Sequence, residues 1–149
     1  MATRKPIVLV NGQLQQLQSG DTLSGPFAEN DTISLTNGDA GSHAIGDIVY
    51  ISAADTAKKA KADAGATVPA VAVATGTIGN GASGTYQTSG ILSGLSGLTA
   101  GAVYFLSDAT AGAMTTTAPT TAGHYVQKLG VAISATEFMI DIDLDYILL

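Results

Sequence analysis

The stretch that indicates the fold is Gly46-Asp47-Ile48-Val49-Tyr50-Ile51-Ser52, which has a counterpart in Gly101-Ala102-Val103-Tyr104-Phe105-Leu106-Ser107. In both, a glycine precedes a run of β-branched, aromatic and other apolar residues. Such a run favours a β-strand that begins directly after a turn. The two stretches therefore predict one kind of β unit that occurs twice in the chain.

Both stretches are followed by the same succession of residue types: an Asp, a Thr, a Pro and then a Val-Ala pair. The first succession is Asp55, Thr56, Pro69 and Val73-Ala74, and the second is Asp108, Thr110, Pro119 and Val131-Ala132. The spacings differ by a few residues, so the repeat is weak. It predicts a strand, a long loop and a return strand, twice.

Further strands are predicted between and after these runs. Residues 71–74 alternate, residues 78–81 have the composition of a hairpin turn, and residues 125–133 form another apolar run. Residues 138–146 alternate strictly, which predicts a strand with Ile140, Ile142 and Leu144 on one face and Asp141, Asp143 and Asp145 on the other. The fold class expected is all-β, a small β-barrel or β-sandwich-like domain over residues 31–149, with an extended N-terminal arm over residues 1–30.

Residues 53–64 are ambiguous. Their alanines and lysines have high helix propensity, and Asp55 and Lys59 stand at a helical i,i+4 spacing. No large apolar residue would give such a helix a face to bury, however, and Gly65 and Pro69 follow closely. We therefore favour extended structure for this segment and keep the helix as the alternative.

The composition limits the kinds of function. The chain has 149 residues, no Cys and no Trp, 5% aromatic residues and 12% charged residues, with a net charge of −6. The lack of Cys excludes disulfides and thiolate metal sites. The acidic balance argues against a nucleic-acid partner, and no apolar run approaches the ~20 residues of a membrane span. Because the apolar residues are mostly small, we expect subunit contacts to contribute much of the stability.

The residues that could carry chemistry are few. His43 and His124 lie in Gly, Ser and Thr surroundings without a nucleophile motif, so we interpret both as loop or surface histidines rather than catalytic ones. The three aspartates at 141, 143 and 145 complete no calcium-loop pattern, and we interpret them as a solvated strand face rather than a metal site. The sequence predicts no catalytic residue, no cofactor, no metal ligand and no small-molecule substrate.

Two groups of residues are candidates for docking on a partner. Residues 1–30 contain too few large apolar residues to fold alone, so the arm should lie on another surface. Three lysines could dock on an acidic surface, although a solvated strand face explains them as well. The candidate docking residues are Ile7, Val8, Leu9, Leu14 and Leu17 in the arm, with Lys58, Lys59 and Lys61 as secondary candidates.

Three parts of the chain resemble virion proteins of tailed bacteriophages. Residues 92–108 (LSGLSGLTAGAVYFLSD), with the VQKLGVAI stretch at 126–133, are similar to a module common in such proteins. Residues 10–23 (VNGQLQQLQSGDTL) look like the opening of phage fibre and head-associated proteins. Residues 46–50 and 71–74 are similar to small capsid decoration proteins of the β-tulip or β-clip type. The resemblance implies a β-rich subunit, usually trimeric, without catalytic residues.

Two functions are compatible with these observations. The first is a capsid decoration (cement) protein or short head fibre that binds the major capsid protein on the outside of the virion as a homotrimer, after synthesis in the bacterial cytoplasm. The alternative is a tail-fibre or receptor-binding component that recognises the host surface. Few aromatic residues are available for binding a host glycan, so we favour the first and expect no enzymatic activity.

Overall fold

Almost all regular structure in this chain is β-strand. The computed structural model describes residues 7–10, 13–16 and 30–149, and the helical structure in these residues is one 3₁₀ turn, Gly65–Thr67 (η1). The all-β prediction is therefore confirmed. In the part of the chain described, no helix has the length and apolar character needed to cross a membrane.

The N-terminal strands form a small sheet of their own. Strands β1 (Ile7–Val10) and β2 (Gln13–Gln16) pair antiparallel, with Leu9 directly opposite Leu14. The remainder of the predicted arm, residues 1–6, 11–12 and 17–29, lies outside the described residues. Over those residues, the extended arm stays a prediction.

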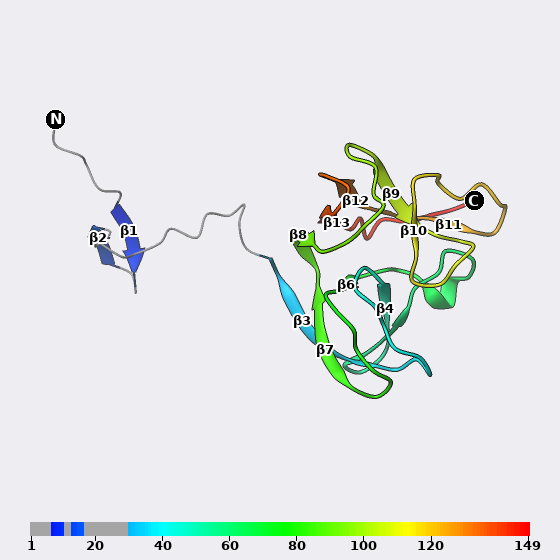
Figure 1. Cartoon of the computed structure of the whole chain (residues 1–149), viewed down its shortest axis with the longest axis horizontal. Helices are drawn as coiled ribbons and strands as arrows, with labels where there is room; N and C mark the ends of the chain where they lie inside the picture. Colours follow the sequence, from blue (N-terminus) through cyan, green and yellow to red (C-terminus); the bar gives the residue numbers. More distant parts are fainter. Residues whose placement is uncertain (1–6, 11–12, 17–29) are drawn as a thin grey trace.

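Five strands close into a barrel, which forms the first unit (Figure 1). The order around the barrel is β3-β5-β4-β6-β7, and the β3–β5 contact is the parallel one. This contact closes the barrel through the N–H of Thr36, which donates to the carbonyl of Asp55 at 2.8 Å. The strands are β3 (Thr32–Asn37), β4 (Ile48–Ala53), β5 (Thr56–Lys59), β6 (Ala72–Ala74) and β7 (Ser83–Gln87).

The second unit is an open sheet with the order β10-β9-β12-β13-β8. Its strands are β8 (Ser89–Ser93), β9 (Val103–Leu106), β10 (Met114–Thr115), β12 (Lys128–Ala132) and β13 (Glu137–Asp141). When the barrel is read from β5, its order is β5-β4-β6-β7-β3, so the two units match strand for strand. Beside them, β11 (Tyr125–Val126) pairs with β14 (Ile147–Leu148).

Matching hydrogen bonds establish that the two units are equivalent. Ile48 lies opposite Val73 in the first unit, and Val103 lies opposite Val131 in the second. The N–H of Gly46 donates to Ala74 at 2.9 Å, and the N–H of Gly101 donates to Ala132 at 2.8 Å. These are the positions that the sequence repeat aligns. In both halves a strand pairs with a return strand, but the connection predicted as a long loop contains further strands, β5 in the first unit and β10 and β11 in the second.

A fully buried aromatic ring lies at the same position in each unit. Tyr86 lies opposite Ala74 in the first unit, and Phe138 lies opposite Ala132 in the second, and both rings are fully buried. A ring this large needs a small residue across from it, because interiors are packed without gaps or overlaps. The abundance of alanine and the scarcity of aromatic residues follow from this arrangement.

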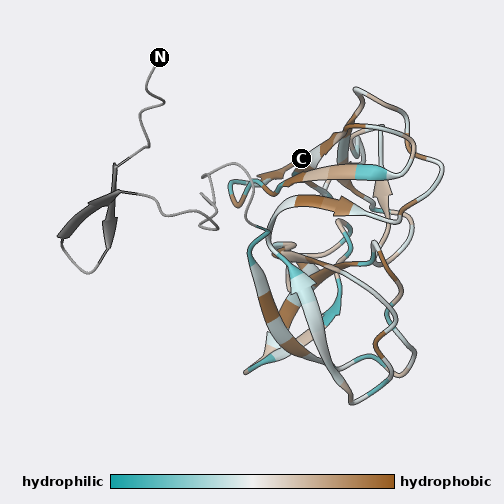
Figure 2. Ribbon diagram, turned by 60° about the vertical axis from the view of Figure 1, so that its left-hand side comes forward, coloured by the Kyte–Doolittle hydropathy of each residue, from teal (hydrophilic) through white to brown (hydrophobic). Residues whose placement is uncertain are grey.

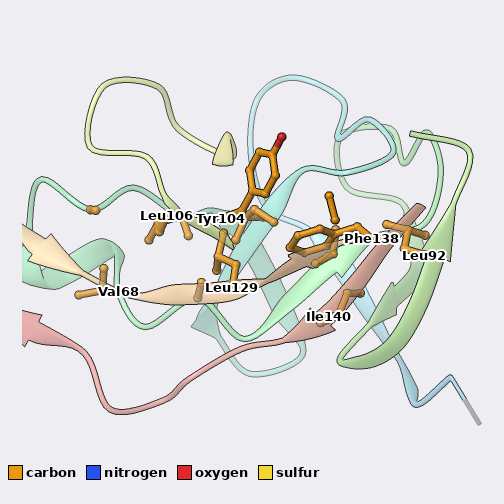
Figure 3. Packing of buried hydrophobic residues seen from close by; sticks show 13 residues of the cluster. Val68, Leu92, Tyr104, Leu106, Leu129, Phe138 and Ile140 are labelled. Carbon is orange, nitrogen blue, oxygen red and sulfur yellow. The ribbon is translucent and has the colours of Figure 1, made fainter. Parts of the chain in front are cut away.

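The second unit stays open because β8, the equivalent of the barrel strand β3, does not pair with β10. Leu95, the equivalent of Thr36, donates its N–H to Thr136 at 3.1 Å, on the β12–β13 connection, instead of to the β10 side. The open side covers the outer face of β4 and β6, where Ile48 and Val73 join the core that contains Tyr104 and Phe138 (Figure 3). The two units therefore share one core, while a smaller cluster fills the barrel alone. Figure 2 shows apolar and polar stretches succeeding one another along the strands of both units.

Two expectations for local structure have different outcomes. The ambiguous segment 53–64 contains strand β5, so extended structure is confirmed there. The strand predicted over 138–146 is wrong beyond Asp141, where β13 ends. The chain turns here. The N–H of Asp145 donates to Asp143 Oδ1 at 2.9 Å, and the N–H of Asp143 donates to the backbone carbonyl of Lys128 at 3.0 Å. Leu144 is consequently exposed and does not share the buried face of Ile140.

We predict that Gly130→Ala strongly destabilises the second unit. A Cβ at this position would lie 2.1 Å from the carbonyl oxygen of Met139, and the backbone φ of +150° disfavours a side chain. Because neither strand can move without disturbing the Phe138 ring, we expect a loss of about 3 kcal/mol or more in the free energy of unfolding. Chemical denaturation measures it. Gly79→Ala is the control, because it meets no atom within 4 Å and should be nearly neutral; equal losses would contradict the packing argument.

Candidate functional site

Most of the predicted arm residues lie in the two-stranded sheet. Ile7, Val8 and Leu9 are in β1 and Leu14 is in β2, whereas Leu17 lies outside the described residues. The pairing of β1 with β2 therefore places Ile7, Val8, Leu9 and Leu14 in one sheet. An isolated two-stranded sheet is marginally stable in water, which is consistent with an element that packs on a partner.

The lysine group is less available than its sequence suggests. Lys59 forms an ion pair with Asp47 at 2.8 Å, and Lys61 forms one with Asp63 at 2.6 Å. All three lysines, Lys58 included, are half-buried. Because carboxylates already neutralise two of the charges, the lysines do not form a continuous basic surface, and they are weaker docking candidates than the apolar residues.

Residues 144–149 form an exposed apolar surface that the sequence analysis did not identify. Leu144, Ile147 and Leu148 are 62%, 64% and 60% exposed, the highest fractions among the large apolar side chains described. Strand β14 is held through its pairing with β11 and through the Tyr146 ring, whose centroid lies 5.6 Å from that of Tyr125. We call residues 144–149 the apolar edge. The sequence analysis missed the apolar edge because the strict alternation predicted through residue 146 assigned Leu144 to a buried face.

His43 lies in the connection between β3 and β4, as the loop interpretation expects, but it is buried and not at the surface. Its Nε2–H donates to Asp39 Oδ2 at 2.9 Å, and its Nδ1 lies 2.7 Å from the hydroxyl of Tyr86. A carboxylate only accepts hydrogen bonds, which assigns the proton to Nε2 and makes the Tyr86 hydroxyl the donor to Nδ1. Burial raises the pKa of Tyr86, and Asp39 and Asp47 raise it further, so this donor stays protonated.

This network closes one end of the barrel. Asp39 also accepts the N–H of Lys59 at 2.8 Å, and Asn37 donates to the carbonyls of Gly41 and Ile78 at 2.9 and 2.8 Å. The Tyr86 and His43 side chains are both fully buried, so the network ties the β3–β4 connection to the barrel interior.

His124 also pairs with a carboxylate, but near the surface. Its Nδ1 lies 2.9 Å from Asp108 Oδ2. This hydrogen bond lowers the pKa of the Asp108 carboxyl, so that it remains ionised. The pair joins residues 119–124 to the loop that follows β9. No nucleophilic side chain takes part in the hydrogen bond, so the pair fixes a loop and offers no acyl-transfer chemistry.

The aspartates at 141, 143 and 145 do not form one carboxylate row. Asp141 pairs with Lys128 at 2.5 Å, and Asp143 accepts a backbone hydrogen bond in the turn after β13. Among residues 7–10, 13–16 and 30–149, no three His, Asp or Glu side chains gather as metal ligands.

A groove of about 380 Å³ lies where the second unit fails to close. Leu95 and Ser96 line one side, and Ala113 and Met114 line the other. Their equivalents in the barrel, on β3 and β5, pair directly with each other. The one charged residue that lines the groove, Asp47, is already bound to Lys59 and to the N–H of Ala44. The groove therefore results from the open sheet and presents no free charge to a ligand.

Comparison with known proteins does not identify a family. No family model, no curated protein and no solved structure matches this chain.

We predict that Tyr86→Phe destabilises the protein by about 1–3 kcal/mol. The variant keeps the ring but leaves the buried Nδ1 of His43 without its donor, and an unsatisfied buried acceptor costs about this much. Urea denaturation measures the change. Tyr104→Phe is the matched control, because its hydroxyl accepts only the N–H of exposed Thr99, at 3.0 Å, which water can replace. Equal losses in the two variants would contradict a special role for the buried network.

Proposed function

We propose that this chain is a structural virion subunit that binds the outer surface of a tailed-phage capsid, through the major capsid protein, and stabilises the shell. The observation that carries the proposal is the apolar edge, residues 144–149, with three large side chains each at least 60% exposed. Several large apolar side chains exposed within one short segment are typical of a site that binds a partner. The resemblance of the sequence to decoration proteins supplies the nature of that partner.

The proposed mechanism is mechanical. Packed DNA pushes the capsid subunits apart, and a protein that bridges several of them adds contacts that must break before the shell ruptures. Such a protein needs a rigid body and apolar contact surfaces. The shared core of the two units supports the first requirement, and the apolar edge supports the second.

The charge distribution favours the apolar edge over the lysines as the primary contact. Two of the three lysines are neutralised within the chain. The net charge of −6 favours solubility and disfavours binding to nucleic acid. The homotrimer implied by the resemblance remains part of this proposal.

We predict that Ile147→Asp releases the protein from capsids. A buried carboxylate would oppose the apolar contact, so we expect at least about a tenfold loss in the amount that sediments with phage heads, together with lower heat resistance of the particles. Ile51→Asp is the matched control, because Ile51 is also exposed but lies on β4 of the barrel. Removal of residues 1–20 should also release the protein if the arm contributes to docking.

Other results would contradict the proposal. Equal release by the two isoleucine variants would show that the apolar edge has no special role. Particles that retain every variant and their normal heat resistance, but no longer adsorb to the host, would favour the tail-fibre or receptor-binding function. A copy number of hundreds per virion agrees with decoration, whereas tens or fewer agree with a tail component.

A further inference from the structure

A buried glutamine holds the chain at the point where the apolar edge begins. The side chain of Gln127 is fully buried, although glutamine is mostly found at protein surfaces. Its Oε1 accepts the N–H of Ala70 at 2.8 Å, and its Nε2 donates to the carbonyls of Ala70 and Asp143, both at 2.9 Å. The amide therefore ties Asp143, the residue before the apolar edge, to the connection between η1 and β6.

The three hydrogen bonds fix the orientation of the Gln127 amide. The N–H of Ala70 can only donate, and the two carbonyls can only accept. An amide turned the other way would face donor with donor and acceptor with acceptor, so a single arrangement satisfies all three contacts. A fully satisfied buried network of this kind specifies one position for the segments that it joins.

Both backbone groups of Asp143 are bound at this point. Its N–H donates to the carbonyl of Lys128 at 3.0 Å, and its carbonyl accepts from Gln127. Gln127 directly follows β11, the strand that pairs with β14, and its own carbonyl accepts the N–H of Leu106 on β9 at 3.0 Å. One short stretch of chain, residues 125–128, therefore holds both the beginning of the apolar edge and strand β14.

The end of the apolar edge is held by backbone hydrogen bonds. The N–H of Leu149 donates to the carbonyl of His124 at 2.9 Å, and its carbonyl accepts the N–H of Gly123 at 2.8 Å. Gln127, in contrast, holds the beginning of the edge through a side chain that lies outside it. A single substitution at Gln127 can therefore release the beginning of the edge while the backbone pairing of its end is kept.

We infer that Gln127 is a positioning residue for the apolar edge. Its amide sets the course of the chain between β13 and β14, and this course sets how Leu144, Ile147 and Leu148 are presented to a partner. Without the amide, the carbonyl of Asp143 loses its donor and the turn after β13 is no longer fixed. The inference rests on the proposed function for the identity of the partner, whereas the positioning itself is a property of the free chain.

Hydrogen exchange of the free full chain, measured by mass spectrometry, tests the inference with Gln127→Met. Methionine is unbranched like glutamine and fills the same space, but it has no amide. We expect the rise in exchange rate over residues 144–149 to exceed any rise in β3 and β7 at least about tenfold. The amount of Gln127→Met that sediments with phage heads should also fall at least about tenfold.

Gln87→Met is the matched control. Gln87 is also buried, at 3% exposure, but it lies on β7 of the barrel, where its Nε2 donates to the carbonyl of Ser89 at 2.9 Å. Its replacement should leave both the exchange of residues 144–149 and the sedimentation with heads unchanged.

Gln127→Asn is a second variant, which decides the question if Gln127→Met does not fold. It keeps an amide in the buried site, but it is a methylene too short to reach Ala70 and Asp143 together. We expect it to raise the exchange of residues 144–149 by a smaller factor than Gln127→Met. Circular dichroism establishes which variants fold.

Four outcomes would overturn the inference. Exchange over residues 144–149 could stay at the wild-type rate in both Gln127 variants, it could rise equally in β3 and β7, or Gln87→Met could have the same effect. Faster exchange of the edge with normal sedimentation of Gln127→Met would break the link between its position and docking. Failure of the wild type to sediment with heads would contradict the proposed function instead, and the exchange rates would still decide the role of Gln127.

Discussion

The packing of one aromatic ring against one alanine underlies both halves of this structure. Tyr86 faces Ala74 and Phe138 faces Ala132, in the same register and at the same place in the strand order. Each ring packs among other buried apolar side chains, such as Leu35 and Ile78 beside Tyr86 and Leu106 and Leu129 beside Phe138. The alanine opposite each ring leaves room for it, because interiors are closely packed.

The two units differ in the backbone hydrogen bonds made at the end of β3 and of its equivalent, β8. Thr36 and Gly38 donate to the carbonyls of Asp55 and Ala57 and close the barrel. Leu95 and Leu98 donate instead to the carbonyls of Thr136 and Ala135 and leave the second unit open. The open unit then covers the outer face of β4 and β6, and the shared core is formed. The difference also produces the groove beside Leu95. Closure of one unit and opening of the other thus decide which surfaces of the two units are buried.

The polar chemistry of the chain serves the scaffold. His43 and Tyr86 seal the barrel end, and His124 with Asp108 fixes a loop. In the part of the chain described, large apolar side chains are exposed at the apolar edge and on the outer face of the second unit, at Ile91, Met139 and Val103.

The sequence by itself determined the all-β class, the repeated strand and return strand, and the extended state of residues 56–59. These follow from β-branched runs and from glycines at turns, which act over a few residues. The sequence also provided the arm residues as docking candidates. It did not indicate the apolar edge or the burial of His43. Only the tertiary structure decided that β13 ends at Asp141, that one unit closes, and that Tyr86 and Phe138 are equivalent. These outcomes depend on hydrogen bonds between residues far apart in the chain, such as His43 with Tyr86 and Leu95 with Thr136. Local residue preferences contain no information about such pairs, because the partners meet only once the strands have assembled.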